Sequence, residues 1–135
     1  MTINLTIDIA GDVVEWQKLL NGVQTVTLAG TSADGAWALT GACAWDVRAG
    51  SSAEEGDVAL TRSDGAELFA TLTGGTVVET AGIDIDAADY AMTLEFDIDG
   101  GSGPFEGVAG TLRAVGRLTR DGFACRVIVA AEPSR

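Results

Sequence analysis

The sequence contains no histidine, and only two cysteines and two prolines among its 135 residues. Without histidine there is no Ser-His-Asp triad, no histidine general base and no histidine-ligated metal site. Basic residues are also few, with eight against 20 acidic ones, and the net charge is −12. That balance argues against binding to a phosphate backbone, which depends on clustered Lys and Arg. No apolar run reaches the ~20 residues that a membrane-spanning helix needs.

The two cysteines, Cys43 and Cys125, lie among apolar neighbours and lack metal-ligand spacing. We expect two reduced thiols in a hydrophobic core. The first residues, 1–5, have neither the basic region nor the apolar stretch of a secretory signal. This pattern predicts a protein that stays in the cytoplasm.

The sequence does have many glycines, 18 in all, and 47% hydrophobic residues. Between turn-forming clusters the apolar residues alternate with polar ones, which is typical of half-buried strands. The predicted strands cover residues 3–9, 23–30, 37–47, 57–62, 67–72, 90–98, 111–119 and 123–131, with a polar loop at 48–56 and the start of a short strand at 77–78. Seven or eight short strands with hairpin turns predict an all-β fold. Because closure removes exposed sheet edges, we expect a single antiparallel, approximately eight-stranded, calycin-like barrel over residues 1–135.

The segment 12–22 allows two interpretations. Val13, Trp16 and Leu20 fall on one face of a helix, and the segment has helical propensity. Asn21-Gly22, between two eight-residue runs, is instead a strong hairpin signal. The propensity favours a short helix or ordered loop near one mouth of the barrel, and the hairpin is the alternative.

A glycine-rich segment carries a family resemblance. Residues 99–110, Asp-Gly-Gly-Ser-Gly-Pro-Phe-Glu-Gly-Val-Ala-Gly, resemble the G-G-S-G-x-F-E-G-x-x-G signature of the allene oxide cyclase family. Residues 12–20 and 54–58 look like weaker copies of that family's first loop and central hairpin. The segment has neither the lysine nor the following helix of a phosphate-binding loop, so its glycines are expected to permit a tight, bulged connection while Phe105 packs inward.

The resemblance implies an eight-stranded barrel of the type shared by allene oxide cyclases, dirigent proteins and small bacterial polyketide cyclases. Some of those bacterial barrels catalyse [4+2] cycloadditions. The chain departs from the plant enzymes at residues 123–127, Phe-Ala-Cys-Arg-Val, where their last strand is rich in aromatics. Its high content of Ala, Gly, Asp and Val favours the bacterial polyketide branch.

The candidate site residues are mostly apolar. The side chains predicted to bind a substrate inside the barrel are Trp16, Trp37, Trp45, Met92, Leu94, Phe96, Phe123 and Val127. A filled core made by the same side chains is the alternative interpretation. Two polar side chains are the predicted catalytic residues. Tyr90 can donate its O–H to a substrate carbonyl, and Gln17 falls where the resembled family carries an amide in its first loop.

The resemblance implies a polyketide-derived polyene as substrate and an intramolecular [4+2] cycloaddition as the most concrete reaction, and with the apolar candidate site it predicts a cyclase that needs no cofactor. A pericyclic ring closure requires a dry, shaped cavity rather than a metal or a nucleotide, and good orientation contributes ~7–11 kcal/mol. The alternatives are a non-catalytic barrel that binds a small apolar ligand, or a structural oligomer. The alanine-rich stretch 36–44, with Val115 and Ile128, predicts an interface in a homodimer or homotrimer. No nucleic acid or membrane partner is expected.

Overall fold

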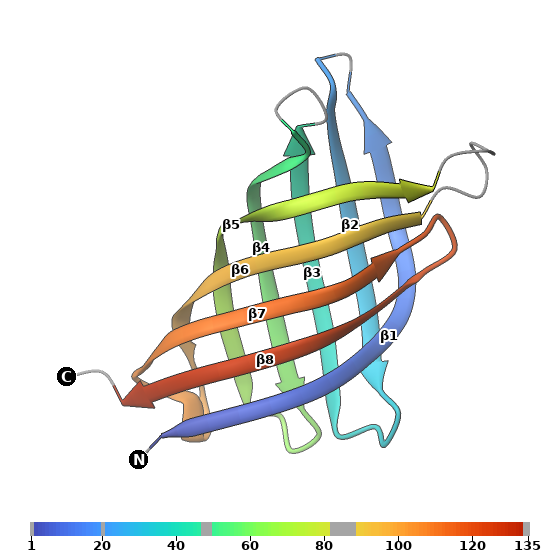
Figure 1. Ribbon diagram of the computed structural model, residues 1–135. Coiled ribbons are helices and arrows are strands. Elements are labelled where there is room, and N and C mark those ends of the chain that lie inside the picture. Colours follow the sequence, from blue (N-terminus) through green and yellow to red (C-terminus); the bar gives the residue numbers. More distant parts are fainter. Residues whose placement is uncertain (1, 20, 47–49, 82–88, 134–135) are drawn as a thin grey trace.

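The computed structural model describes residues 2–19, 21–46, 50–81 and 89–133. Every strand pairs antiparallel with its sequence neighbours, and the first strand pairs with the last, so the sheet is a closed barrel (Figure 1). The strands are β1 (Ile3–Lys18), β2 (Val23–Ser32), β3 (Trp37–Asp46), β4 (Ser52–Arg62), β5 (Glu67–Ala81), β6 (Asp89–Gly101), β7 (Val108–Leu118) and β8 (Phe123–Pro133). A 3-10 turn, η3 (Gly103–Phe105), precedes β7. The predicted antiparallel, eight-stranded, all-β barrel is confirmed.

The alternation of apolar and polar residues produces this barrel directly. In β6 the even-numbered residues from Tyr90 to Ile98 are buried, and Glu95 and Asp97 between them are exposed as expected. In β8 the odd-numbered residues from Phe123 to Ala131 are buried in the same way. Because successive side chains of a strand point to opposite faces, one face of every strand contributes to a common interior.

The preference for a helix or loop near Val13–Leu20 was wrong, because β1 continues as a strand to Lys18. A tight turn follows it. The backbone N–H of Val23 donates to the side-chain oxygen of Asn21, and Gly22 adopts a φ of 88°. Pairing with β2 along this stretch satisfies the backbone amides, whereas a helix of so few residues is marginal on its own. The hairpin interpretation of Asn21-Gly22 was therefore the correct one, and Leu20 itself lies outside the described residues.

A β-bulge in β1 decides which side chains of this stretch enter the barrel. The register with β2 shifts between Val13 and Glu15, so that Trp16 pairs with the buried Val26 while Gln17 pairs with Thr25. The extra residue, Val14, points outward and is 64% exposed. Trp16 therefore faces the interior, and Gln17 faces outward.

Two strands are longer than the sequence pattern indicated. The predicted polar loop at 48–56 is in its second part the beginning of β4, and residues 47–49 lie outside the described residues. The predicted separate strand at 77–78 is the continuation of β5. Pairing with neighbouring strands extends both segments although their own alternation is weak.

The glycine-rich connection between β6 and β7 has the structural role expected of it. Phe105 at the end of η3 is buried against the core. A Cβ on Gly101 would lie only 2.1 Å from the carbonyl oxygen of Glu67, so the two backbones meet at a distance that only glycine permits. The described residues contain no helix long and apolar enough to span a membrane.

Candidate functional site

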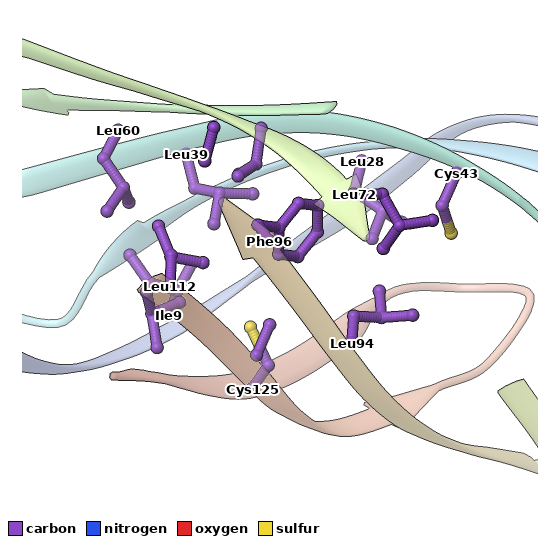
Figure 2. Packing of buried hydrophobic residues seen from close by; sticks show 14 of the residues in the cluster. Ile9, Leu28, Leu39, Cys43, Leu60, Leu72, Leu94, Phe96, Leu112 and Cys125 are labelled. Carbon is purple, nitrogen blue, oxygen red and sulfur yellow. The ribbon is translucent and has the colours of Figure 1, made fainter. Parts of the chain in front are cut away.

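Buried side chains from all eight strands pack into one hydrophobic cluster in the interior of the barrel. Within the described residues, a small cavity of about 40 Å³ lies among them. Four of the predicted substrate-binding residues line it: Met92, Leu94, Phe96 and Phe123. Figure 2 shows Leu94 and Phe96 packed among other aliphatic side chains of this core. Val127 is buried in the same core but is not among the residues around the cavity. The filled-core alternative therefore describes most of the interior.

Three aromatic side chains close one end of the barrel. Trp16 comes from the end of β1, Trp45 from the end of β3 and Tyr90 from the beginning of β6. The ring centroids of Trp16 and Trp45 are 5.6 Å apart in an edge-to-face arrangement, and Tyr90 lies 5.3 Å from Trp16 and 6.0 Å from Trp45. These distances are in the range of favourable aromatic pairs. We call these three residues the aromatic cluster.

One polar side chain, Gln24 of β2, joins two members of the aromatic cluster. Its side-chain oxygen accepts a hydrogen bond from Nε1 of Trp16 at 2.8 Å. Gln24 also hydrogen-bonds the Tyr90 side chain in the sense that lowers the phenol pKa. That effect is expected when the amide N–H donates to the phenol oxygen, which leaves the phenol proton available for donation.

The Tyr90 phenol is nonetheless held in its neutral form. Burial raises its pKa above the usual value of about 10, and the nearby charge of Glu79 acts in the same direction. The hydrogen bond with Gln24 and the charge of Arg120 oppose this shift without reversing it. At neutral pH Tyr90 is a hydrogen-bond donor.

Trp45 carries the one buried side-chain N–H that lacks a hydrogen-bond partner in the described part of the chain. The residue is 0% exposed, and its Nε1 makes no hydrogen bond. A buried donor without a partner costs roughly 1–3 kcal/mol. Such groups are rare in folded proteins, so this one is an observation that requires an explanation.

The structure separates the predicted site residues into four groups, the fourth being Trp37 at the opposite end of the barrel. Tyr90, Trp16 and Trp45 lie together in the aromatic cluster, and the cavity residues lie in the core. Gln17 lies outside, where its exposed amide donates a hydrogen bond to Glu15. Its outward position follows from the bulge in β1.

Trp37 lies at the opposite end of the barrel, at the beginning of β3. Its ring centroid is 6.0 Å from that of Phe105, and the guanidinium carbon of Arg62 lies 5.6 Å from the Phe105 ring centroid. Arg62 is in turn paired with Asp64, at 3.0 and 2.6 Å. We call Trp37, Phe105, Arg62 and Asp64 the plug.

The residue that sequence reasoning missed is Gln24. It precedes Val26 and Leu28 on the inward face of β2, so it is a polar residue at a core position. This departure from the alternation could have identified Gln24 from the sequence, because a polar group at an inward position needs a hydrogen-bond partner. Among the described residues, no group of three or more carboxylate, thiol or imidazole side chains is arranged to hold a metal ion.

Comparisons with known proteins give no family assignment: no protein-family model, no curated protein and no solved structure matches this chain. The likeness to allene oxide cyclases therefore stays a resemblance of sequence motifs, and so do the activity and source it implies.

Proposed function

We propose that the protein binds a small apolar molecule that carries one hydrogen-bond acceptor, at the aromatic cluster. The observation that carries this proposal is the buried, unpartnered N–H of Trp45. A carbonyl or ether oxygen placed against Nε1 would satisfy this donor and remove the cost of leaving it unpaired. The surrounding rings would supply apolar contact area for the rest of the ligand.

The size of the interior limits where such a ligand can lie. Pockets for small organic molecules commonly have volumes of about 300–1,000 Å³. The 40 Å³ cavity has room only for a group about the size of one water molecule. A larger ligand has to displace the side chain of Trp16, which is only half-buried, and occupy the end of the barrel.

Cyclisation of a polyene is a second candidate function. The contact between Tyr90 and Trp45 favours it, because their O–H and N–H groups are two neutral donors beside an apolar wall. Two such donors could polarise one carbonyl of a bound substrate and hold its reacting ends near each other. The polyketide origin of the substrate, and [4+2] cycloaddition as the reaction, rest on the family resemblance alone.

Ligand binding is tested by tryptophan fluorescence with two probes of equal length, a linear polyenone and the polyene hydrocarbon without the carbonyl. The native protein should bind the polyenone about tenfold more tightly, which corresponds to about 1.4 kcal/mol for one hydrogen bond. Trp45→Phe should abolish this preference and retain the binding of the hydrocarbon. Trp37→Phe, the matched control in the plug, should preserve it. Equal affinity of the native protein for both probes would remove the assigned role of Trp45, and absence of binding would overturn the proposal.

The cyclase proposal is tested in the natural producer of the protein. Deletion of the gene should cause a linear polyene to accumulate, and the purified protein should cyclise that compound faster than buffer does. Trp45→Ala should lower the rate more than Tyr90→Phe, because positioning contributes more to ring closure than polarisation does. If no linear intermediate accumulates, or if buffer cyclises it equally fast, only the binding function remains.

A further inference from the structure

Positive charge is concentrated on one side of the barrel, on β7, β8 and the turn between them. Two of the eight basic residues, Arg48 and Arg135, lie outside the described residues. Of the remaining six, four belong to this part of the sheet: Arg113, Arg117, Arg120 and Arg126. Since the net charge of the whole chain is −12, this side of the barrel attracts acidic surfaces that the rest of the molecule repels.

The strand register places exposed aliphatic side chains among these arginines. On the outer face of β7, Val115 lies two residues from both Arg113 and Arg117, and it pairs directly with Arg126 of β8. Val115 is 38% exposed, and Ile128, which pairs with Arg113, is 39% exposed. The side chains of facing residues on one side of an antiparallel pair are in contact range. We call these five residues the basic patch.

A second patch on the outer face of β4, β5 and β6 has the opposite charge. Thr71 of β5 pairs with Asp57 on one side and with Asp97 on the other, and its hydroxyl donates a hydrogen bond to Asp99. Phe69, two residues before Thr71 on the same face of β5, is 42% exposed. An outer groove of about 430 Å³ runs along this ring, with carboxylates in its wall. We call these five residues the acidic patch.

The plug shows how this protein combines an arginine with a ring and a carboxylate. There the guanidinium carbon of Arg62 lies 5.6 Å from the Phe105 ring centroid, and Asp64 pairs with the guanidinium at 2.6 Å. A planar guanidinium can stack on a ring and bind a carboxylate at the same time. The acidic patch offers an exposed ring and exposed carboxylates of the same kind on the outer surface of the barrel.

The basic patch contains an arginine that is suited to fill this role. Arg126 pairs with Asp8 at 2.9 Å, and Arg113 lies 4.0 Å from Glu95. Arg117 is exposed, and within the described part of the chain it has no ion-pair partner. Its guanidinium is therefore available to a second molecule.

We propose that the basic patch of one copy of this chain binds the acidic patch of a second copy. In this contact the guanidinium of Arg117 stacks on the ring of the partner's Phe69 and pairs with the partner's Asp57. The contact also covers the exposed side chains of Val115 and Ile128. Arginine and aromatic side chains are enriched in protein interfaces for these reasons.

Two observations favour a second copy over an unrelated acidic partner. The same chain carries both patches, and each supplies what the other lacks: arginines beside exposed aliphatic groups, and carboxylates beside an exposed ring. The charge of each copy also repels every approach in which two acidic surfaces meet, so the basic patch fixes the orientation of the encounter. Because the patches lie on different strands, two copies that exchange both contacts form a closed dimer, and copies that do not close form a longer chain.

The test begins with single charge reversals followed by sedimentation equilibrium. The native protein should form assemblies heavier than the 13.8 kDa chain. Arg117→Glu and Asp57→Arg should each lower the association constant at least about tenfold, because like charges then face each other across the contact. Phe69→Ser should lower it as well. Neither charge reversal creates a like-charged pair within the sheet, because the cross-strand neighbours are neutral: Ala91 and Ala124 for Arg117, and Ala42 and Thr71 for Asp57.

A mixture of the two reversed variants separates this contact from a general effect of charge. Each variant alone should be monomeric, whereas an equimolar mixture should assemble. In the mixture the Asp57 of one variant meets the Arg117 of the other, and the two introduced charges meet with their signs exchanged. A chain that carries both substitutions should associate with itself for the same reason. Lys18→Glu and Glu106→Arg change the net charge by the same amounts at exposed positions outside both patches, and as matched controls they should associate like the native protein.

Three outcomes would overturn the proposed contact. A native protein that stays monomeric at every concentration has no such interface. If one of the three substitutions leaves the native association unchanged, the assembly uses another face of the barrel. If the reversed variants stay monomeric in the mixture, the two patches do not meet. The result is independent of the proposed binding of an apolar ligand, since Trp45→Phe alters neither patch and should leave the assembly intact.

Discussion

The two ends of the barrel contain similar numbers of aromatic rings but differ in how their polar groups are satisfied. In the plug, Arg62 lies against the Phe105 ring and forms an ion pair with Asp64, so its charge has partners on both sides. At the aromatic cluster, Gln24 accepts a hydrogen bond from Trp16 and forms another with Tyr90, while the N–H of Trp45 remains unpaired. The two ends therefore differ less in aromatic content than in hydrogen bonding. The unpaired N–H of Trp45 is the observation on which the proposed binding at this end rests.

The largest expected effect concerns the tryptophan of each end. Trp45→Ala should lower the free energy of unfolding by about 3–5 kcal/mol, because it leaves a large cavity in a fully buried position. Trp37→Ala should cost roughly half of that, since Trp37 is only half-buried. Urea denaturation followed by far-UV circular dichroism measures both values. A larger loss for Trp37→Ala would reverse the assignment of the two ends.

The second prediction tests the backbone that supports the plug. Gly101→Ala should destabilise the barrel by about 1–3 kcal/mol, because the new Cβ would collide with the carbonyl oxygen of Glu67. Gly74→Ala is the matched control, since nothing lies within 4 Å of a Cβ at that position. We expect its unfolding free energy to stay within about 0.5 kcal/mol of the native value. Similar losses in both variants would mean that the close approach of the chains at Gly101 is unimportant.

The third prediction concerns Gln24. Gln24→Leu should cost about 1 kcal/mol and should raise the pKa of Tyr90 further, because the hydrogen bond that lowers it is lost. Tyr90 is the single tyrosine of the chain, so the absorbance of the phenolate reports its titration directly. Gln17→Leu, which removes an exposed amide from the outer face, should leave that titration unchanged.

The same titration has a consequence for stability. A phenol whose pKa is higher in the folded state than in the unfolded chain contributes stability that is complete below the unfolded value of about 10 and is lost as the pH rises above it. Unfolding midpoints measured between pH 9 and 11, roughly one unit either side of that value, should therefore fall more steeply in Gln24→Leu than in the native protein.

The smallest expected effect is a change in stability at acid pH, and it concerns Asp64 of the plug. The hydrogen bonds from Arg62 and the Ala66 amide lower the pKa of Asp64 from 3.8 to about 2. A carboxylate with a lowered pKa contributes stability above its unfolded value, and this contribution is lost as the pH falls through about 2. Because Asp64 is exposed, we expect only a small change in the acid midpoint, absent in Asp64→Asn. Equal acid sensitivity of both proteins would show that the ion pair does not stabilise the plug.

The fold was predictable wherever the alternation of residues is unbroken. The runs 3–9, 90–98 and 123–131 each place one parity inside, and eight such runs leave few architectures besides a sandwich or a barrel. Residues 13–18 were misread because helical propensity is a local property, whereas pairing with β2 depends on a strand that follows later in the chain. The bulge that turns Trp16 inward leaves no distinct mark in the sequence.

The site was predictable only in part, because alternation gives the face of a strand but not the position along the barrel axis. Trp37 and Trp45 share a face of β3, yet eight residues at about 3.4 Å each place them about 27 Å apart, at opposite ends. Tyr90, Trp45 and Trp16 meet because β6 begins at the level where β1 and β3 end. That coincidence depends on the pairing registers, which a single sequence does not specify.

The closure of the barrel by β1 and β8 has a kinetic consequence. Nine residues of β1, from Ile3 to Gly11, pair with Ala131 to Phe123 at the other end of the chain (Figure 1). The ring of hydrogen bonds cannot be completed until the most distant segments of the polypeptide have met, so the entropy of closing the largest possible loop has to be overcome first. We expect slow folding, in the range of milliseconds to seconds that is typical of β proteins dominated by non-local contacts. Until that step, two unpaired edges are open to other chains, and dilute refolding should give a higher yield than concentrated refolding.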